Sequence, residues 1–132
     1  MEEYKSKQAQ VNQPAEMIYS TLSDFNNFTP ILQDKVEGWQ ATADTCAFKV
    51  KGFEVKLRIT DREPGSHIKI EGEEGSPFDF AFWLQMKEVG ENDTRIRLVL
   101  HVKLNMMMKM MVGGKIQSTL DEVVQQMADT FN

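Results

Sequence analysis

The sequence predicts an α+β domain in which one curved antiparallel sheet wraps around a single long C-terminal helix. From Asn105 to Phe131, apolar residues recur at spacings of three and four, which is the pattern of one helix face. Upstream of this segment most of the chain alternates between apolar and polar residues, as strands do, and turn residues separate the alternating runs. With 132 residues and no linker-like stretch, residues 1–132 are expected to form one domain.

Composition limits the classes of function. The chain has 20 acidic and 15 basic residues and a net charge of −5, which disfavours binding to nucleic acid or to an anionic membrane. Its single cysteine, Cys46, excludes an internal disulfide and a multi-cysteine metal site. Since no apolar signal region opens the sequence and no run approaches the ~18 apolar residues of a membrane span, we expect a cytoplasmic protein without stable membrane insertion.

The first third of the chain predicts one strand and two short helices. Residues 3–11 alternate weakly and are expected to form the first strand, with Ala9 and Val11 facing inward. Pro14 favours a helix start, so residues 15–22 are predicted as a short helix. Asp24 is expected to cap a second short helix that contains Phe25 and Phe28.

Turn residues predict the pairing of the next strands. A two-residue turn at 51–52 would place Phe48 opposite Val55. The Pro64-Gly65 pair is typical of a type II turn, and this register places Ile59 opposite Ile70 and Arg58 opposite Glu71, with Lys56 opposite Glu73. Opposite charges that face each other across strands are stabilising, which supports the register.

The last predicted hairpin has the clearest alternation and brings the sheet to seven strands. Its turn lies at residues 90–93 and places Trp83 opposite Val99 on the outer face. This pair either covers the sheet or forms a small patch for a weak homodimer. The inward stripes are Phe78, Phe80, Phe82, Leu84 and Met86 on one strand and Ile96, Leu98, Leu100, Val102 and Leu104 on the other.

A methionine-rich segment precedes the long helix. Five of the nine methionines lie between Met106 and Met111, and methionine suits surfaces that adapt to varied apolar partners. The segment is either core filler or a ligand-contacting lid. Because glycine costs about 1 kcal/mol inside a helix, the Gly113-Gly114 pair predicts a break or kink there, with a short helix before it.

Residues 11–32, VNQPAEMIYSTLSDFNNFTPIL, resemble the opening of the START / polyketide cyclase / birch-pollen-allergen (SRPBCC) superfamily. The matching positions are Pro14, Ala15, Glu16, Tyr19, Leu22, Asp24, Phe28 and Pro30. The family more often has tryptophan where Tyr19 and Phe28 stand. The resemblance implies a helix-grip fold with an apolar cavity between sheet and helix. It implies no single activity, because this fold hosts lipid carriers, hormone receptors, cyclases and co-chaperone domains.

The sequence offers little catalytic chemistry. No GxSxG, HExxH, CxxC, Walker or GxGxxG pattern is present, and no metal or cofactor is expected. Strand alternation places His67 and His101 on the outer face, and Cys46 faces inward opposite Leu57 as a buried, inert thiol. The middle of the inward strand positions carries no carboxylate, histidine or lysine that could act as a general acid or base.

The leading hypothesis is therefore a non-catalytic protein that binds a hydrophobic small molecule, such as a lipid or polycyclic compound, mainly by apolar burial. One alternative is a cyclase or dehydratase that acts through Tyr19, Glu37 or Asp61 at the pocket mouth. Another is a co-chaperone-like interaction module that uses the outer face around Trp83. The predicted lining is Phe25, Phe28, Trp39, Phe48, Leu57, Ile59, Ile70, Phe80, Phe82, Leu98, Leu100, Met108 and Met111.

Overall fold

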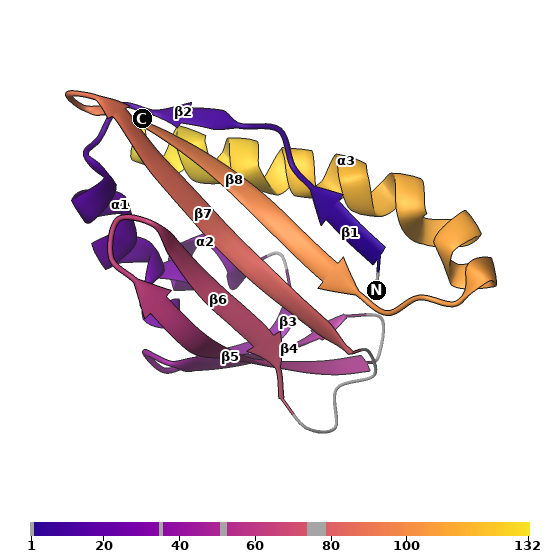
Figure 1. Ribbon diagram of the computed structural model, residues 1–132. Coiled ribbons are helices and arrows are strands. Elements are labelled where there is room, and N and C mark those ends of the chain that lie inside the picture. Colours follow the sequence, from indigo (N-terminus) through magenta and orange to yellow (C-terminus); the bar gives the residue numbers. More distant parts are fainter. Residues whose placement is uncertain (1, 35, 51–52, 74–78) are drawn as a thin grey trace.

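A long helix lies along one side of a curved antiparallel sheet, and shorter helices close one end (Figure 1). The computed structural model describes residues 2–34, 36–50, 53–73 and 79–132. The strands are β1 (Glu2–Lys5), β2 (Ala9–Val11), β3 (Glu37–Ala41), β4 (Thr45–Val50), β5 (Phe53–Glu63), β6 (His67–Gly72), β7 (Phe80–Gly90) and β8 (Asp93–Val102). The helices are α1 (Ala15–Leu22), the 3-10 helix η1 (Phe25–Phe28), α2 (Thr29–Leu32) and α3 (Met106–Phe131). The predicted α+β class is confirmed.

The sheet follows the order β1-β8-β7-β6-β5-β4-β3, and β2 also pairs with β8. The predicted first strand is thus two short strands, since Lys5 pairs with Val99 whereas Ala9 pairs with Ile96. One extra residue is accommodated between these pairs, which is the arrangement of a β-bulge. Buried Ser6 bridges the gap, because its backbone N–H donates to the Leu98 carbonyl at 2.8 Å and its hydroxyl accepts from the Leu98 N–H at 2.9 Å.

The predicted strand pairing is confirmed at the centre of the sheet. Phe48 pairs with Val55, and Trp83 pairs with Val99. Arg58 also lies opposite Glu71, as expected. The two-residue turn predicted at 51–52 lies outside the described residues, and so does Phe78.

The ion pairs on the outer face run mostly along or diagonally across the strands. Arg58 contacts Glu73 at 3.1 Å, and Lys69 contacts its own strand neighbour Glu71 at 3.0 Å. These side chains are exposed or half-buried, so each pair contributes at most about 1 kcal/mol. The register therefore depends on the turns and on apolar alternation more than on the charges.

A second bulge changes the end of β5. Ile59 pairs with Ile70, but Asp61 pairs with Lys69, so Thr60 is the extra residue. Beyond it the alternation is reversed, and Arg62 lies opposite the fully buried Ile68 on the inner face. The Pro64-Gly65 turn between β5 and β6 has the predicted type II geometry, with Gly65 at φ +75°.

α3 runs without interruption from Met106 to Phe131, so the chain does not break into two helices at Gly113-Gly114. Asn105 caps the helix, because its side-chain oxygen accepts from the Met108 N–H at 2.8 Å. Gly113 also allows a close approach, since a Cβ there would lie 3.1 Å from the Tyr4 hydroxyl. The helix packs against β1, β2 and β8 and buries Leu120, Val124, Met127 and Ala128 (Figure 1).

Candidate ligand-binding site

An apolar cavity of about 190 Å³ lies between the C-terminal half of α3 and the part of the sheet that α3 does not cover. Its walls come from η1, α2, the strands from β3 to β7, and α3. They are almost entirely aromatic and aliphatic. The lining residues are Phe25, Phe28, Leu32, Trp39, Cys46, Phe48, Leu57, Ile70, Phe82, Leu84, Val123, Gln126 and Met127.

Two aromatic pairs shape the wall. Trp39 and Phe48 lie on neighbouring strands with ring centroids 6.0 Å apart, and Phe25 and Phe28 are 5.9 Å apart. The indole N–H of Trp39 donates to the Thr29 hydroxyl at 2.8 Å. Because this bond satisfies the polar edge of the ring, the apolar faces of Trp39 remain available for packing.

Arg62 connects three segments of the chain by hydrogen bonds. Its guanidinium donates through Nε and Nη2 to the Ser23 carbonyl at 3.1 and 3.0 Å, and through Nη2 to Asp44 Oδ1 at 2.6 Å. These bonds join the C-terminal end of α1 and the β3–β4 turn to β5. The bulge at Thr60 makes this contact geometrically accessible, because it turns Arg62 to the inner face.

Cys46 is the one titratable side chain among the described lining residues. It is 4% exposed, and burial, assisted by the nearby negative charge of Glu73, raises the pKa of its thiol to about 12. The thiol is therefore neutral near pH 7 and is a poor nucleophile. The described residues also contain no group of three potential metal ligands.

The structure brings seven of the predicted lining residues together and separates the others. Ile59 and Leu98 are packed in the core, at 6% and 1% exposure, and do not reach the cavity. Leu100 packs against the same core, and Phe80 is half-buried at the start of β7 outside the cavity. The predicted residues that do line it are Phe25, Phe28, Trp39, Phe48, Leu57, Ile70 and Phe82.

The methionine-rich segment is neither core filler nor cavity wall. Met106, Met107, Met110 and Met111 are between 68% and 82% exposed, and Met108 is half-buried. Because α3 does not break, its first turns extend past the end of the sheet (Figure 1). The placement of Met108 and Met111 in the lining is accordingly corrected.

The residues predicted at the pocket mouth lie elsewhere. Asp61 is on the outer face, where its Oδ2 lies 2.9 Å from His67 Nε2, because the Thr60 bulge reverses its direction. Glu37 is exposed on β3 opposite Lys49, and Tyr19 packs against the core. None of the three lines the cavity.

Sequence reasoning did not select six lining residues. Cys46 and Leu84 have inward strand positions, and Val123 and Met127 belong to the apolar face of the predicted helix, so the pattern contained a signal for them. Leu32 and Gln126 had no comparable signal. The missing information was the path of α3 relative to the sheet.

The outer face around Trp83 is less apolar than the sequence suggested. Val99 is only 5% exposed, so it adds little surface to the patch that was one of the two interpretations of the Trp83–Val99 pair. The Trp83 ring makes an edge contact with His101 at 4.6 Å between centroids, and the Lys69 ammonium lies 5.3 Å from its centre.

Within the described part of the chain, no helix combines the length and apolar character needed to cross a membrane.

Solved structures with the same architecture share little sequence with this chain. A START superfamily protein from Mycobacterium smegmatis is 17% identical, with a TM-score of 0.69 and coverage of 98% of this chain and 99% of that one. TTHA0849 from Thermus thermophilus is 19% identical, with a TM-score of 0.65 and coverage of 98% and 94%. The Aha1 dimer from Colwellia psychrerythraea is 14% identical, with a TM-score of 0.61 and coverage of 92% and 97%. These similarities establish a START-like helix-grip fold.

Sequence comparison identifies the family. No curated protein sequence matches the chain significantly. The family profile of CoxG, a carbon monoxide dehydrogenase subunit, matches residues 8–132, which is nearly the whole chain and includes every lining residue of the cavity. Together with the START-like fold, this match shows that the chain belongs to the CoxG family.

Proposed function

We propose that this CoxG-family protein binds an uncharged hydrophobic small molecule, a lipid or a polycyclic compound, in the cavity beside α3. The observation that carries the proposal is the cavity itself, about 190 Å³ of space lined by aromatic and aliphatic side chains. Burial of apolar ligand surface contributes about 25 cal/mol per Å², so such walls favour an apolar occupant.

The size of the cavity limits the ligand. Pockets for drug-sized molecules are commonly about 300–1,000 Å³, so 190 Å³ accommodates a compact ring system or one end of a longer molecule. Val123 is 39% exposed, and Gln126 is also exposed on α3. These two lining residues mark the side from which a ligand reaches solvent.

The chemistry of the lining favours binding over catalysis. General acid–base catalysis needs a titratable group within reach of the reacting atoms, and the described lining offers only the neutral Cys46 thiol. Tyr19, Glu37 and Asp61, which the enzyme alternative required, lie outside the lining. The interaction-module alternative has weaker support, because Val99, which lies opposite Trp83, is buried and adds little apolar surface to the outer face.

A fluorescence titration with the neutral probe N-phenyl-1-naphthylamine tests the proposal. The wild type should bind the probe saturably. Cys46→Phe, which fills the cavity, should weaken binding at least about tenfold, a loss of about 1.4 kcal/mol. Ala47→Phe adds the same ring on the same strand but on the opposite face, so it serves as the matched control.

Two results would overturn the proposal. One is the absence of saturable probe binding to the folded wild type. The other is equal probe affinity in the two phenylalanine variants, with circular dichroism showing that both remain folded.

A further inference from the structure

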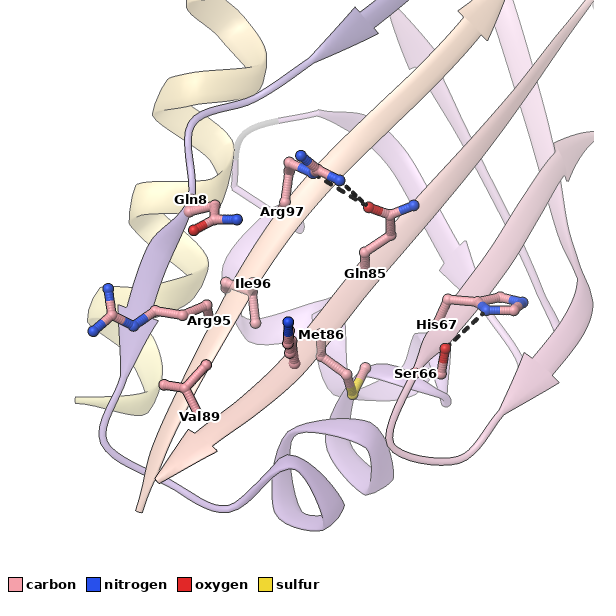
Figure 2. A pocket seen from close by; sticks show the side chains of 10 residues that line it. Gln8, Ser66, His67, Gln85, Met86, Val89, Arg95, Ile96 and Arg97 are labelled. Atoms are coloured by element: carbon pink, nitrogen blue, oxygen red, sulfur yellow. Dashed lines mark hydrogen bonds between the residues drawn. The ribbon is translucent and has the colours of Figure 1, made fainter. Parts of the chain in front are cut away.

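A second depression, of about 370 Å³, lies on the outer face of the sheet, away from the apolar cavity (Figure 2). Strands β7 and β8 form its floor, with the start of β6 on one side and the β1–β2 connection on the other. Its lining residues are Gln8, Ser66, His67, Gln85, Met86, Lys87, Val89, Arg95, Ile96 and Arg97.

The depression is positively charged in a negatively charged protein. Lys87, Arg95 and Arg97 line it, and none of its described lining residues is a carboxylate. The chain as a whole has a net charge of −5. A local excess of cations against this background indicates a surface that attracts anions.

Two of these cations oppose each other across the strands. Lys87 on β7 pairs directly with Arg95 on β8. Like charges in this position destabilise a sheet by a few tenths of a kcal/mol or more. Asp93 offsets part of this repulsion at Arg95, and an anion bound beside Lys87 would offset more of it.

Arg97 is oriented by a neutral partner, which does not compensate its positive charge. Its Nε and Nη2 donate to Gln85 Oε1 at 3.2 and 2.9 Å, and Figure 2 shows the two side chains facing each other on neighbouring strands. Gln85 is neutral, so this contact orients the guanidinium and leaves its Nη1 group available to a ligand. A pre-oriented arginine loses little conformational entropy when it binds an oxyanion.

Two carboxylates that contact lining residues of the depression, Asp93 and Asp61, already have partners. Asp93 accepts from Arg95 Nε at 3.2 Å, and Asp61 lies 2.9 Å from His67 Nε2. Among the ion pairs of the described residues, none includes Lys87 or Arg97. The centre of the depression thus keeps two uncompensated positive charges.

We propose that this depression binds a small molecule that carries phosphate or carboxylate groups. Arg97 and Lys87 would supply the charge, and the amide groups of Gln85 and Gln8 lie where they can orient the ligand by hydrogen bonds. A concave site of this volume fits a small organic anion. The site is independent of the apolar cavity, which opens on the other face of the sheet.

Isothermal titration calorimetry with sodium pyrophosphate at constant ionic strength tests the proposal. Wild-type protein should bind one pyrophosphate per chain, and Arg97→Gln should weaken binding at least about tenfold. Gln85→Glu should have a similar effect although it retains every cation, because the new carboxylate would neutralise Arg97. Lys103→Gln removes an exposed charge just beyond the other end of β8 and is the matched control.

Absence of saturable heat with the wild type would overturn the proposal. So would an equal loss of affinity in Arg97→Gln, Gln85→Glu and Lys103→Gln, because that result would reflect net charge alone. Pyrophosphate should not displace N-phenyl-1-naphthylamine, and displacement would show that the two sites are not separate.

Discussion

The inner surface of the sheet carries apolar side chains on both its β8 side and its β4 side, but these side chains have different surroundings. On the β8 side, Leu98 and Val124 are 1% and 0% exposed, because α3 packs directly against the strands. On the β4 side, Phe48 and Phe82 are only half-buried and surround a cavity. An inward apolar residue therefore contributes to stability or to binding according to whether the helix lies opposite it.

The largest expected effect separates these two sides by core substitution. Leu98→Ala should cost about 2–5 kcal/mol, because it removes buried contacts and leaves a void. Phe82→Ala should cost less than about 2.5 kcal/mol, below the usual range for a buried phenylalanine, because part of its ring already faces empty space. Urea unfolding of both variants without added ligand measures the difference.

If Phe82→Ala is clearly the more damaging of the two, the inner surface is packed solid at that point. The distinction between the two sides would then be incorrect, and the cavity would lose its main physical support.

A smaller effect is expected at Arg62, which links α1 and the β3–β4 turn to β5. Arg62→Met should cost about 1–3 kcal/mol, because the Ser23 carbonyl loses both of its guanidinium bonds in a partly buried setting. Arg58→Met is the control, since its ion pair with Glu73 is on the exposed face and should be worth about 0–1 kcal/mol.

If both variants lose the same free energy of unfolding in urea, the Arg62 hydrogen bonds contribute no more than an exposed ion pair. The Arg62 variant should also bind N-phenyl-1-naphthylamine more weakly, because the end of α1 and the β3–β4 turn are no longer fastened to β5.

Alanine substitution should affect stability differently at the two glycines of α3. Gly114→Ala should raise the free energy of unfolding by up to about 1 kcal/mol, because alanine favours the helix and a Cβ there meets nothing within 4 Å. Gly113→Ala should gain less or lose stability, since its Cβ would lie 3.1 Å from the Tyr4 hydroxyl. Matching gains in thermal or urea unfolding would show that Tyr4 does not pack closely on this helix.

The last expected effect concerns Cys46 and appears only at alkaline pH. An unfolded thiol has a pKa of about 8.5, whereas burial raises the folded pKa to about 12. Between these values the unfolded state binds fewer protons than the folded state, so the stability contribution of the neutral thiol is lost as pH rises. Cys46→Ala should therefore lose less stability than the wild type between about pH 8 and pH 10.5 in urea unfolding. Parallel pH dependences would indicate that the thiol is not buried.

Much of the fold could be predicted, because strand alternation and short turns are local properties. Pro64-Gly65, the turn at residues 90–93 and the period of two together specified which residues pair between β5 and β6 and between β7 and β8. The bulges at Ser6 and Thr60 could not be predicted, since each adds one residue without a distinctive sequence. The Thr60 bulge reversed Asp61 and Arg62, so the pocket mouth was misassigned.

The candidate site was harder to predict than the fold. Alternation showed that Leu98 and Phe82 both face inward, but only the path of α3 distinguishes a packed residue from a cavity residue. Gly113 and Gly114 suggested a break in that path. Their low helix propensity was outweighed by the Asn105 cap and by packing against β1, β2 and β8.

Native mass spectrometry of freshly purified protein, followed by solvent extraction, tests the central claim most directly. We expect a reproducible apolar molecule bound to the wild type and to Ala47→Phe, and its absence from Cys46→Phe. The same bound mass in both phenylalanine variants would contradict the assignment of the cavity as the binding site. So would a bare wild-type chain that also fails to take up N-phenyl-1-naphthylamine.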